Sequence, residues 1–206
     1  GAIRHRQDRN AVFLASRNAG LYVYHDDRID QPIIPIPTRA LTITDVAAPG
    51  DSETWMGLWR AGALHLAGKK RTLYTEEQGL PSNSVHSLAH LRSGALLVGT
   101  ALGLAMIRRE SGVTPLKDSL LDRRTIFDLQ GAGGDSVWAG TDEGPRLLAF
   151  RDDSLLSVRR LPATGLDGEI VYAILIDSRR RIWVGTDGSG AGRYDGTNVS
   201  RVTAED

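Results

Sequence analysis

Three acidic doublets are the first residues of the sequence that could do chemistry. Asp26-Asp27, Asp142-Glu143 and Asp152-Asp153 each place two carboxylates side by side. Neighbouring residues on an extended chain point to opposite faces, whereas glycoside hydrolysis needs two facing carboxylates roughly 5–10 Å apart. A glycoside-active enzyme would therefore have to pair carboxylates from different parts of the chain, and that alternative stays open at this point.

A phosphate loop and a metal site are not indicated. The glycine-rich run 188–192 lacks the Gly-Lys-Ser/Thr ending of a phosphate loop, and no helix pattern follows it. It predicts a plain turn, because glycine tolerates the positive φ that turns require. His86 and His90 lie four residues apart on a predicted strand, ~13 Å, which is too far to share a metal ion. We therefore predict no metal and no cofactor, and expect packing or surface positions for both histidines.

Threonine and arginine recur without the neighbours that catalysis needs. Thr100, Thr141 and Thr186 each follow a glycine, but no base recurs beside them, so hydrogen bonds inside each unit are expected rather than nucleophiles. Three arginine clusters are expected to be solvated turn tips, with recognition of an anionic ligand or partner as the alternative. These clusters are Arg123-Arg124, Arg159-Arg160 and Arg179-Arg180-Arg181.

Composition narrows the class of protein. The chain has 206 residues, 41% of them hydrophobic, which is enough to bury a core. Its formal net charge is zero, so a nucleic-acid partner is not expected. The absence of cysteine excludes disulfides, thiolate metal sites and cysteine nucleophiles. No run of about 18 apolar residues occurs, so we expect contact with a membrane only through parts outside this segment.

The elements that must position these residues repeat along the chain. Residues 171–194 contain an apolar run, a turn, a short run ending in Gly-Thr, and a third run after a glycine-rich turn. The doublet or its equivalent recurs with spacings of 42, 42, 41 and 45 residues, which indicates a repeat architecture. The five copies are Ala15-Ser16, Gly57-Leu58, Gly99-Thr100, Gly140-Thr141 and Gly185-Thr186.

Three of the four tryptophans share one phase of this repeat. Trp55, Trp138 and Trp183 each stand two residues before the doublet glycine. The preference of tryptophan for strands does not by itself explain a shared phase. We therefore predict that the three side chains occupy equivalent, largely buried positions.

The fold class predicted is all-β, a β-propeller of about five four-stranded blades. No segment has a sustained helical period, and each unit holds about four short apolar runs separated by turn residues. The opening strand, Ile3 to Gln7, has a weak strand pattern. Residues 32–37 alternate proline with isoleucine, which predicts an edge strand or a connector. A turn is expected at Gly131 to Asp135. The repeats cover about 1–41, 42–84, 85–125, 126–170 and 171–206.

Two stretches of the sequence resemble the two-component regulator propeller repeat. Gly79-Leu80-Pro81-Ser82-Asn83-Ser84-Val85 is similar to its Gly-Leu-Pro-x-Asn-x-Val opening, and 171–196 is similar to the remainder, with Asp177 and Trp183 in place. Ala15-Ser16 and Gly57-Leu58 depart from Gly-Thr, and Arg181 replaces the turn glycine.

The resemblance implies the periplasmic or extracellular sensor region of a bacterial inner-membrane receptor, a hybrid histidine kinase or a diguanylate cyclase. Propellers of this family usually have seven blades. The chain is therefore expected to be either a closed five-bladed ring or part of a larger propeller.

The leading hypothesis for function is a non-catalytic propeller that senses a small-molecule ligand, a carbohydrate or another polar molecule. In propellers the turn between the second and third strands and the linker between blades open on one face, around the central axis, and mixed polar groups with an aromatic suit such a ligand. The residues expected there are Arg17, Asn18, Trp59, Arg60, Ser82, Asn83, Arg123, Asp142, Glu143, Glu169, Asp187 and Ser189.

Two alternatives belong to other classes. A five-bladed glycoside-active enzyme would need at least two carboxylates converging in the central pocket, and a protein-docking scaffold would show an apolar exposed face. Because an arc of blades leaves open edges, we also expect self-association or contact with neighbouring propeller blades.

Overall fold

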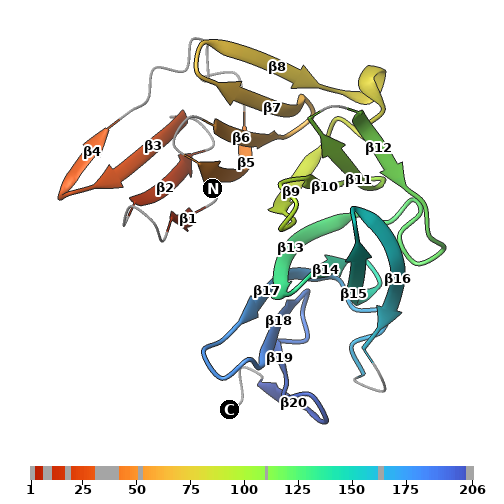
Figure 1. Ribbon diagram of the computed structural model, residues 1–206. Coiled ribbons are helices and arrows are strands. Elements are labelled where there is room, and N and C mark those ends of the chain that lie inside the picture. Colours follow the sequence, from red (N-terminus) through yellow and green to blue (C-terminus); the bar gives the residue numbers. More distant parts are fainter. Residues whose placement is uncertain are drawn as a thin grey trace.

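The computed structural model describes residues 3–6, 11–16, 20–30, 42–50, 53–109, 111–161 and 165–202. Within these ranges, twenty strands form five antiparallel sheets of four strands. Each sheet is a meander whose strands pair in chain order. Figure 1 shows the sheets following one another along an arc, with the first strand of each sheet on the inside and the fourth on the outside. The predicted all-β architecture of four-stranded blades is therefore confirmed.

Each blade holds four consecutive strands of the chain. The first blade has β1 (Ile3–Arg6), β2 (Ala11–Ser16), β3 (Gly20–His25) and β4 (Arg28–Asp30), and the second has β5 (Ile43–Gly50), β6 (Glu53–Leu58), β7 (Gly62–Ala67) and β8 (Lys70–Tyr74). The third has β9 (Val85–His90), β10 (Leu96–Thr100), β11 (Gly103–Arg108) and β12 (Gly112–Leu116). The fourth has β13 (Ile126–Gly133), β14 (Ser136–Thr141), β15 (Gly144–Arg151) and β16 (Ser154–Arg160), and the fifth has β17 (Val171–Ile176), β18 (Ile182–Thr186), β19 (Ala191–Tyr194) and β20 (Val199–Val202).

Two local features differ from the sequence-based expectations. β13 continues to Gly133 through a register shift after Gly131, so the turn is shorter than predicted. A 3₁₀ helix at Glu76–Gln78, capped by Thr75, precedes the Gly-Leu-Pro linker. The fourth strand of the first blade is β4, and the proline-rich segment 32–37 lies outside the described residues.

The glycine of the doublet is where one blade packs closely on the next. In the second to fourth blades, an added Cβ at this glycine would stand 2.8 Å from the residue that opens the next blade. Side chains do not fit at that distance, so only glycine allows the two blades to approach so closely. The contacts are Gly57 with Val85, Gly99 with Ile126 and Gly140 with Val171.

The threonine of the doublet closes the following turn. Its hydroxyl donates to a backbone carbonyl of the same blade, from Thr100 to Gly103 at 2.8 Å and from Thr141 to Gly144 at 2.7 Å. Thr186 donates to Gly190 at 2.8 Å in the same way. The predicted internal hydrogen bonds are confirmed. In the second blade Leu58 replaces threonine and is buried in the core instead.

A polar side chain on the first strand of a blade fastens the first strand of the next blade. The position is held by Asp45 on β5, Ser87 on β9 and Asp128 on β13, and each accepts a backbone N–H across the interface between blades. These bonds satisfy backbone N–H groups on first strands, each of which has a neighbouring strand in its sheet on one side only. The bonds run from Leu88 N to Asp45 Oδ2 at 2.8 Å, from Leu129 N to Ser87 Oγ at 3.0 Å and from Ile174 N to Asp128 Oδ2 at 2.7 Å. We call this series of bonds the axial staple.

The three tryptophans occupy equivalent positions, as predicted. Each lies opposite the same register position of the first strand, Trp55 facing Ala47, Trp138 facing Gln130 and Trp183 facing Leu175. Trp55 and Trp138 are only 5% and 6% exposed. Trp183 is half-buried: its Nε1 donates to Asp177 at 3.0 Å and two arginines flank its ring. The expectation of burial is thus met in full by two of them, because a following blade covers Trp55 and Trp138, whereas no following blade covers Trp183 among the described residues.

Candidate functional site

The predicted ligand face is built from turns and linkers that lie at one end of the sheets. In four blades, the backbone N–H of the turn between the second and third strands donates to the carbonyl of the residue just before or at the start of the first strand. This repeated bond confirms that the two kinds of loop open together. The bonds are Trp59 N to Thr42 O, Ala101 N to Ser84 O, Asp142 N to Thr125 O and Asp187 N to Ile170 O, at 2.9, 3.0, 3.3 and 3.0 Å.

A row of aromatic rings crosses four blades at this face. Trp59 meets His86 at 5.3 Å between ring centroids, His86 meets Phe127 at 5.5 Å, and Phe127 meets Tyr172 at 4.9 Å. The rings are steeply inclined to one another, the edge-to-face arrangement that aromatic pairs favour. Trp59 and Tyr172, at the two ends, are 46% and 50% exposed. We call these four side chains the aromatic row.

A β-bulge near the start of the first strand in the second to fifth blades supplies three of the four members of the row, while Trp59 comes from the turn between β6 and β7. The ladder skips one residue there, which is Thr44 in β5, His86 in β9, Phe127 in β13 and Tyr172 in β17. A bulge re-aims the side chain that it carries. These positions are spaced by 42, 41 and 45 residues, the spacing of the doublets, so superposing the repeats could have revealed the three aromatic members that the sequence-based site omitted.

His86 is the member of the row whose ring can carry a positive charge. Burial lowers the pKa of its imidazole below the ordinary value of 6.5. The ring is therefore neutral at pH 7 and presents an aromatic surface rather than a charge. The expectation that His86 is a packing or surface residue is met, with the added finding that its packing partners are the rings beside it.

Charged groups of the fourth blade lie at the same end. Arg146, on β15, is fully buried, and burial lowers the pKa of its guanidinium. Its Nη2 donates to the carbonyl of Glu143 at 2.8 Å, and its Nη1 lies 3.6 Å from Asp167 Oδ1. Arg124 Nη1 contacts Glu143 Oε1 at 2.6 Å. Of the predicted residues, Glu143 is thus held by two arginines that were not in the predicted site.

Two predicted residues meet directly in the fifth blade. Ser189, in the turn after β18, donates to Glu169 in the linker before β17, at 2.9 Å from Oε1. Arg201 Nη2 lies 3.6 Å from the same carboxylate oxygen. The turn and the linker therefore share a polar cluster, as the predicted face requires.

The other predicted residues are placed as follows. Arg60, Arg123 and Asp187 are exposed, and both arginines have positive φ. Ser82 is buried and accepts from Ser84 N at 3.1 Å, while Asn83 accepts from Glu76 N at 2.8 Å, so both side chains already bond to the backbone of their own linker. Asp142 has one buried oxygen, Oδ1, without a hydrogen-bond partner among the described residues. Arg17 and Asn18 lie outside the described residues.

This face combines what small-molecule sites usually have. Such sites pair an apolar or aromatic lining with a few placed polar groups. Here the row supplies ring surface across four blades, and the polar clusters around Glu143 and Glu169 lie at the same end of the neighbouring sheets. The arrangement can hold a ligand with one ring-like face and several hydroxyl or amide groups.

Comparison with known proteins agrees with the repeat found in the sequence. The family model for the two component regulator propeller matches residues 165–188, which run from the linker before β17 to the turn after β18. The resemblance is therefore confirmed in the fifth blade. No curated protein sequence matches the chain.

Solved structures share the fold at low sequence identity. The extracellular domain of the hybrid two-component system BT3049 from B. thetaiotaomicron has a TM-score of 0.74 at 18% identity, covering 93% of this chain and 27% of that one. The corresponding domain of BT4673 from the same organism has a TM-score of 0.74 at 19% identity, covering 99% and 28%. A catalytically inactive virginiamycin B lyase from Staphylococcus aureus, solved with quinupristin, has a TM-score of 0.75 at 10% identity, covering 98% and 69%. The chain thus spans about a quarter of the two ectodomains.

Proposed function

We propose that this chain is a ligand-sensing part of an extracytoplasmic propeller in a bacterial signal-transduction receptor, a histidine kinase or a diguanylate cyclase, and that it binds a carbohydrate or a similar polar molecule without transforming it. The observation that carries the proposal is the aromatic row at the face where turns and linkers meet. The family match and the likeness to two receptor ectodomains support the location and the receptor context. In the described part of the chain, no helix has the length and apolar character needed to cross a bilayer.

The chemistry of the face favours a saccharide among polar ligands. A sugar ring has an apolar face that can lie against aromatic rings, and hydroxyls that exchange hydrogen bonds with carboxylates, serines and arginines. Trp59 and Tyr172 offer their exposed ring surface at the ends of the row. Ser189 and Glu169 offer a hydroxyl and a carboxylate in the fifth blade.

Binding without catalysis is favoured by how the carboxylates are held. Glu143 contacts Arg124 and Arg146, and Glu169 contacts Ser189 and Arg201. Both carboxylates are already engaged in ion pairs and hydrogen bonds within the protein, so fewer of their lone pairs remain to meet a substrate. The likeness to a lyase shows that the fold also accommodates enzymes, so the experiment below includes a test for turnover.

The test is to measure the binding of a panel of neutral and acidic oligosaccharides by saturation-transfer NMR and calorimetry. Trp59→Ala and Tyr172→Ala are each expected to weaken the best binder at least about tenfold, the loss typical of truncating an aromatic anchor. Leu156→Ala, which removes an exposed apolar side chain from the outer strand β16, is the matched control and is expected to change nothing.

Two results would contradict the proposal. One is that no saccharide binds, or that binding is the same in the two row variants as in the control. The other is that the bound saccharide is recovered as a cleaved or rearranged product, which would favour the enzyme. Recovery of intact ligand, with loss of binding confined to the row variants, supports a sensor.

A further inference from the structure

A cavity lies at the other end of the sheets from the aromatic row. Its volume is about 580 Å³, and three blades line it. Glu53 comes from the start of β6, Ser93 from the turn between β9 and β10, and Asp153 from the turn between β15 and β16. Arg108, Arg109 and Ser111 come from the β11–β12 hairpin. Because those turns are at the opposite ends of the strands from the bulges, this cavity is separate from the face described above.

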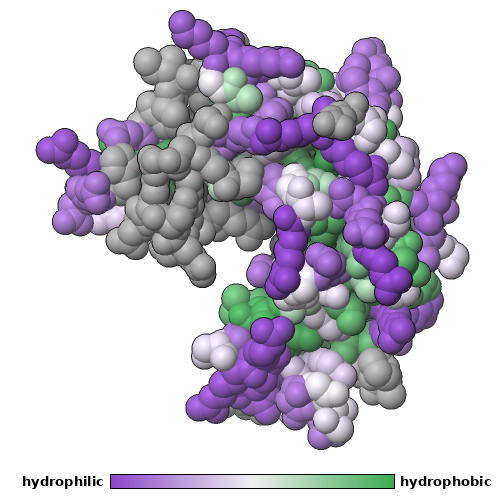
Figure 2. Space-filling model, in the orientation of Figure 1, coloured by the Kyte–Doolittle hydropathy of each residue, from purple (hydrophilic) through white to green (hydrophobic). Residues whose placement is uncertain are grey.

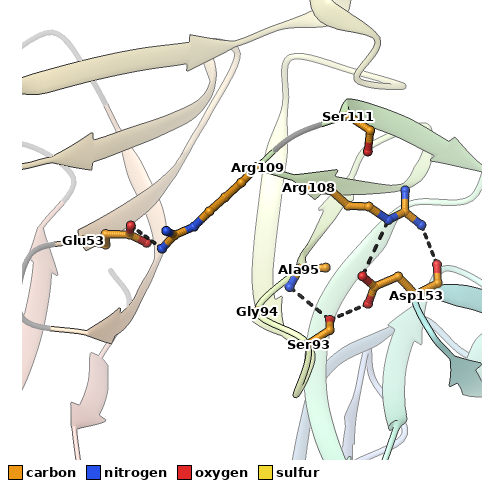
Figure 3. Close-up of a pocket in the computed structure, with 8 residues that line it drawn as sticks. All are labelled: Glu53, Ser93, Gly94, Ala95, Arg108, Arg109, Ser111 and Asp153. Carbon is orange, nitrogen blue, oxygen red and sulfur yellow. Dashed lines mark hydrogen bonds and ion pairs between the residues drawn. The ribbon is translucent and has the colours of Figure 1, made fainter.

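The cavity has charges of both signs in close pairs. Figure 3 shows Arg109 reaching across to Glu53 of the second blade, while Arg108 turns toward Asp153 of the fourth. Arg108 Nη2 donates to the carbonyl of Asp153 at 2.5 Å and its Nε lies 3.7 Å from Asp153 Oδ2, so this arginine is held firmly. Ser93 donates to the same carboxylate. The fourth blade is thereby tied to the wall of the cavity.

The Arg109–Glu53 pair is held differently. The Arg109 side chain is 74% exposed and Glu53 only 16%. An ion pair with one end in water stabilises little, because solvent screens it and the long side chain loses entropy. A ligand that offers each partner an opposite charge can therefore replace this pair at small cost.

An aromatic recess adjoins the charged cavity. A smaller space of about 240 Å³ shares Glu53, Gly94 and Arg109 with it. It is lined further by the apolar or aromatic residues Trp55, Tyr74 and Ile107 and by the polar residues Lys70 and Thr72. His65 stacks on Trp55 with ring centroids 3.9 Å apart, and Trp55 stacks on Tyr74 at 5.6 Å. Burial lowers the pKa of His65, so its ring is neutral at pH 7, although its Nε2 lies 3.8 Å from Glu53 Oε2.

We propose that this cavity binds an aromatic α-amino acid. The carboxylate of the ligand pairs with Arg109, its ammonium with Glu53, and its ring enters the recess beside Trp55 and Tyr74. A zwitterion matches a cavity whose two arginines are balanced by two carboxylates, whereas a simple anion would face Glu53 and Asp153 and a simple cation would face the arginines. The proposal does not depend on the ligand of the aromatic row.

The experiment is calorimetric titration of the purified chain with L-phenylalanine and three truncated probes. 3-Phenylpropionate lacks the ammonium, 2-phenylethylamine lacks the carboxylate, and L-alanine lacks the ring. Phenylalanine is expected to bind at least about tenfold more tightly than each of them, since a hydrogen bond to a charged group and the burial of an aromatic ring are each worth that much. Arg109→Gln and Glu53→Gln are each expected to weaken phenylalanine binding by at least about tenfold.

Arg179→Gln is the matched control for Arg109→Gln, because it removes the same charge from an exposed turn of the fifth blade. Circular dichroism of each variant checks that it is folded. Loss of phenylalanine binding in the two cavity variants alone supports the proposal. Absence of phenylalanine binding at millimolar concentration, equal binding of 3-phenylpropionate, or equal losses in all three variants overturns it.

Discussion

A single added methyl group tests how closely one blade packs on the next. At Gly140 a Cβ would meet the carbonyl oxygen of Val171 at 2.8 Å, and backbone at that position cannot swing aside as a flexible side chain can. At Gly185, the equivalent glycine of the fifth blade, the nearest atom is Ala173 Cβ at 3.8 Å, an ordinary contact. Neither residue has positive φ, so the comparison isolates packing.

Gly140→Ala is therefore expected to destabilise the protein by about 1–3 kcal/mol, the usual cost of overpacking, and Gly185→Ala by less than about 0.5 kcal/mol. Urea denaturation followed by tryptophan fluorescence measures both. Equal destabilisation by the two variants would show that the doublet glycine is required within its own blade and not for close packing against the next blade.

At the scale of the blade, the axial staple links first strands that have no ladder between them. Asp128→Ala removes the acceptor for Ile174 N at the interface of the fourth and fifth blades. Leaving an interior N–H unsatisfied costs about 1–3 kcal/mol. We expect that loss from Asp128→Ala, together with faster hydrogen exchange at Ile174 by NMR. Asp187→Ala, an exposed site in the fifth blade, is the control and is expected to stay within about 0.5 kcal/mol of the parent. Unchanged exchange at Ile174 would mean that the staple adds nothing to the interface.

The sequence predicted the blades better than the side chains that join them. The spacing of the doublets, together with the apolar runs between turns, predicted the sheets and the equivalence of Trp55, Trp138 and Trp183. The shared face of turns and linkers was expected from the general geometry of propellers. From the second to the fifth blade, the staple position is occupied by Asp45, Ser87, Asp128 and Ala173. The bulge position is occupied by Thr44 in the second blade and by an aromatic residue in each of the next three. Such positions have a common geometry but no common residue, so they emerge only when the bulge and the register are known. The charged cavity was missed because its residues come from three blades, and the sequence alone does not place the turns of different blades side by side.

At the scale of the molecule, the fifth blade exposes a face whose equivalent in each of the second to fourth blades is covered by the next blade. In the second to fourth blades, the doublet glycine and the staple residue contact the next first strand, whereas Gly185 and Ala173 meet no such strand among the described residues. Leu175 is 61% exposed and Trp183 half-buried on this blade. Figure 2 shows hydrophobic surface in the region of β17, beside the hollow of the arc. A face of this kind fits another blade, in continuity with the interfaces within the chain.

The chain studied alone is therefore expected to self-associate through this face, because an uncovered apolar surface with a strand edge promotes association. Small-angle scattering at several concentrations is expected to give a radius of gyration that rises with concentration, above the roughly 17 Å of a compact monomer of this length. Leu175→Lys places a charge in the centre of the face and is expected to shift the chain toward monomer. Leu156→Lys, at an equally exposed site on the outer strand β16, is expected to leave association unchanged. A monomer near 17 Å at every concentration would instead indicate that the five blades close on themselves, because only closure would cover the face of the fifth blade without a second chain.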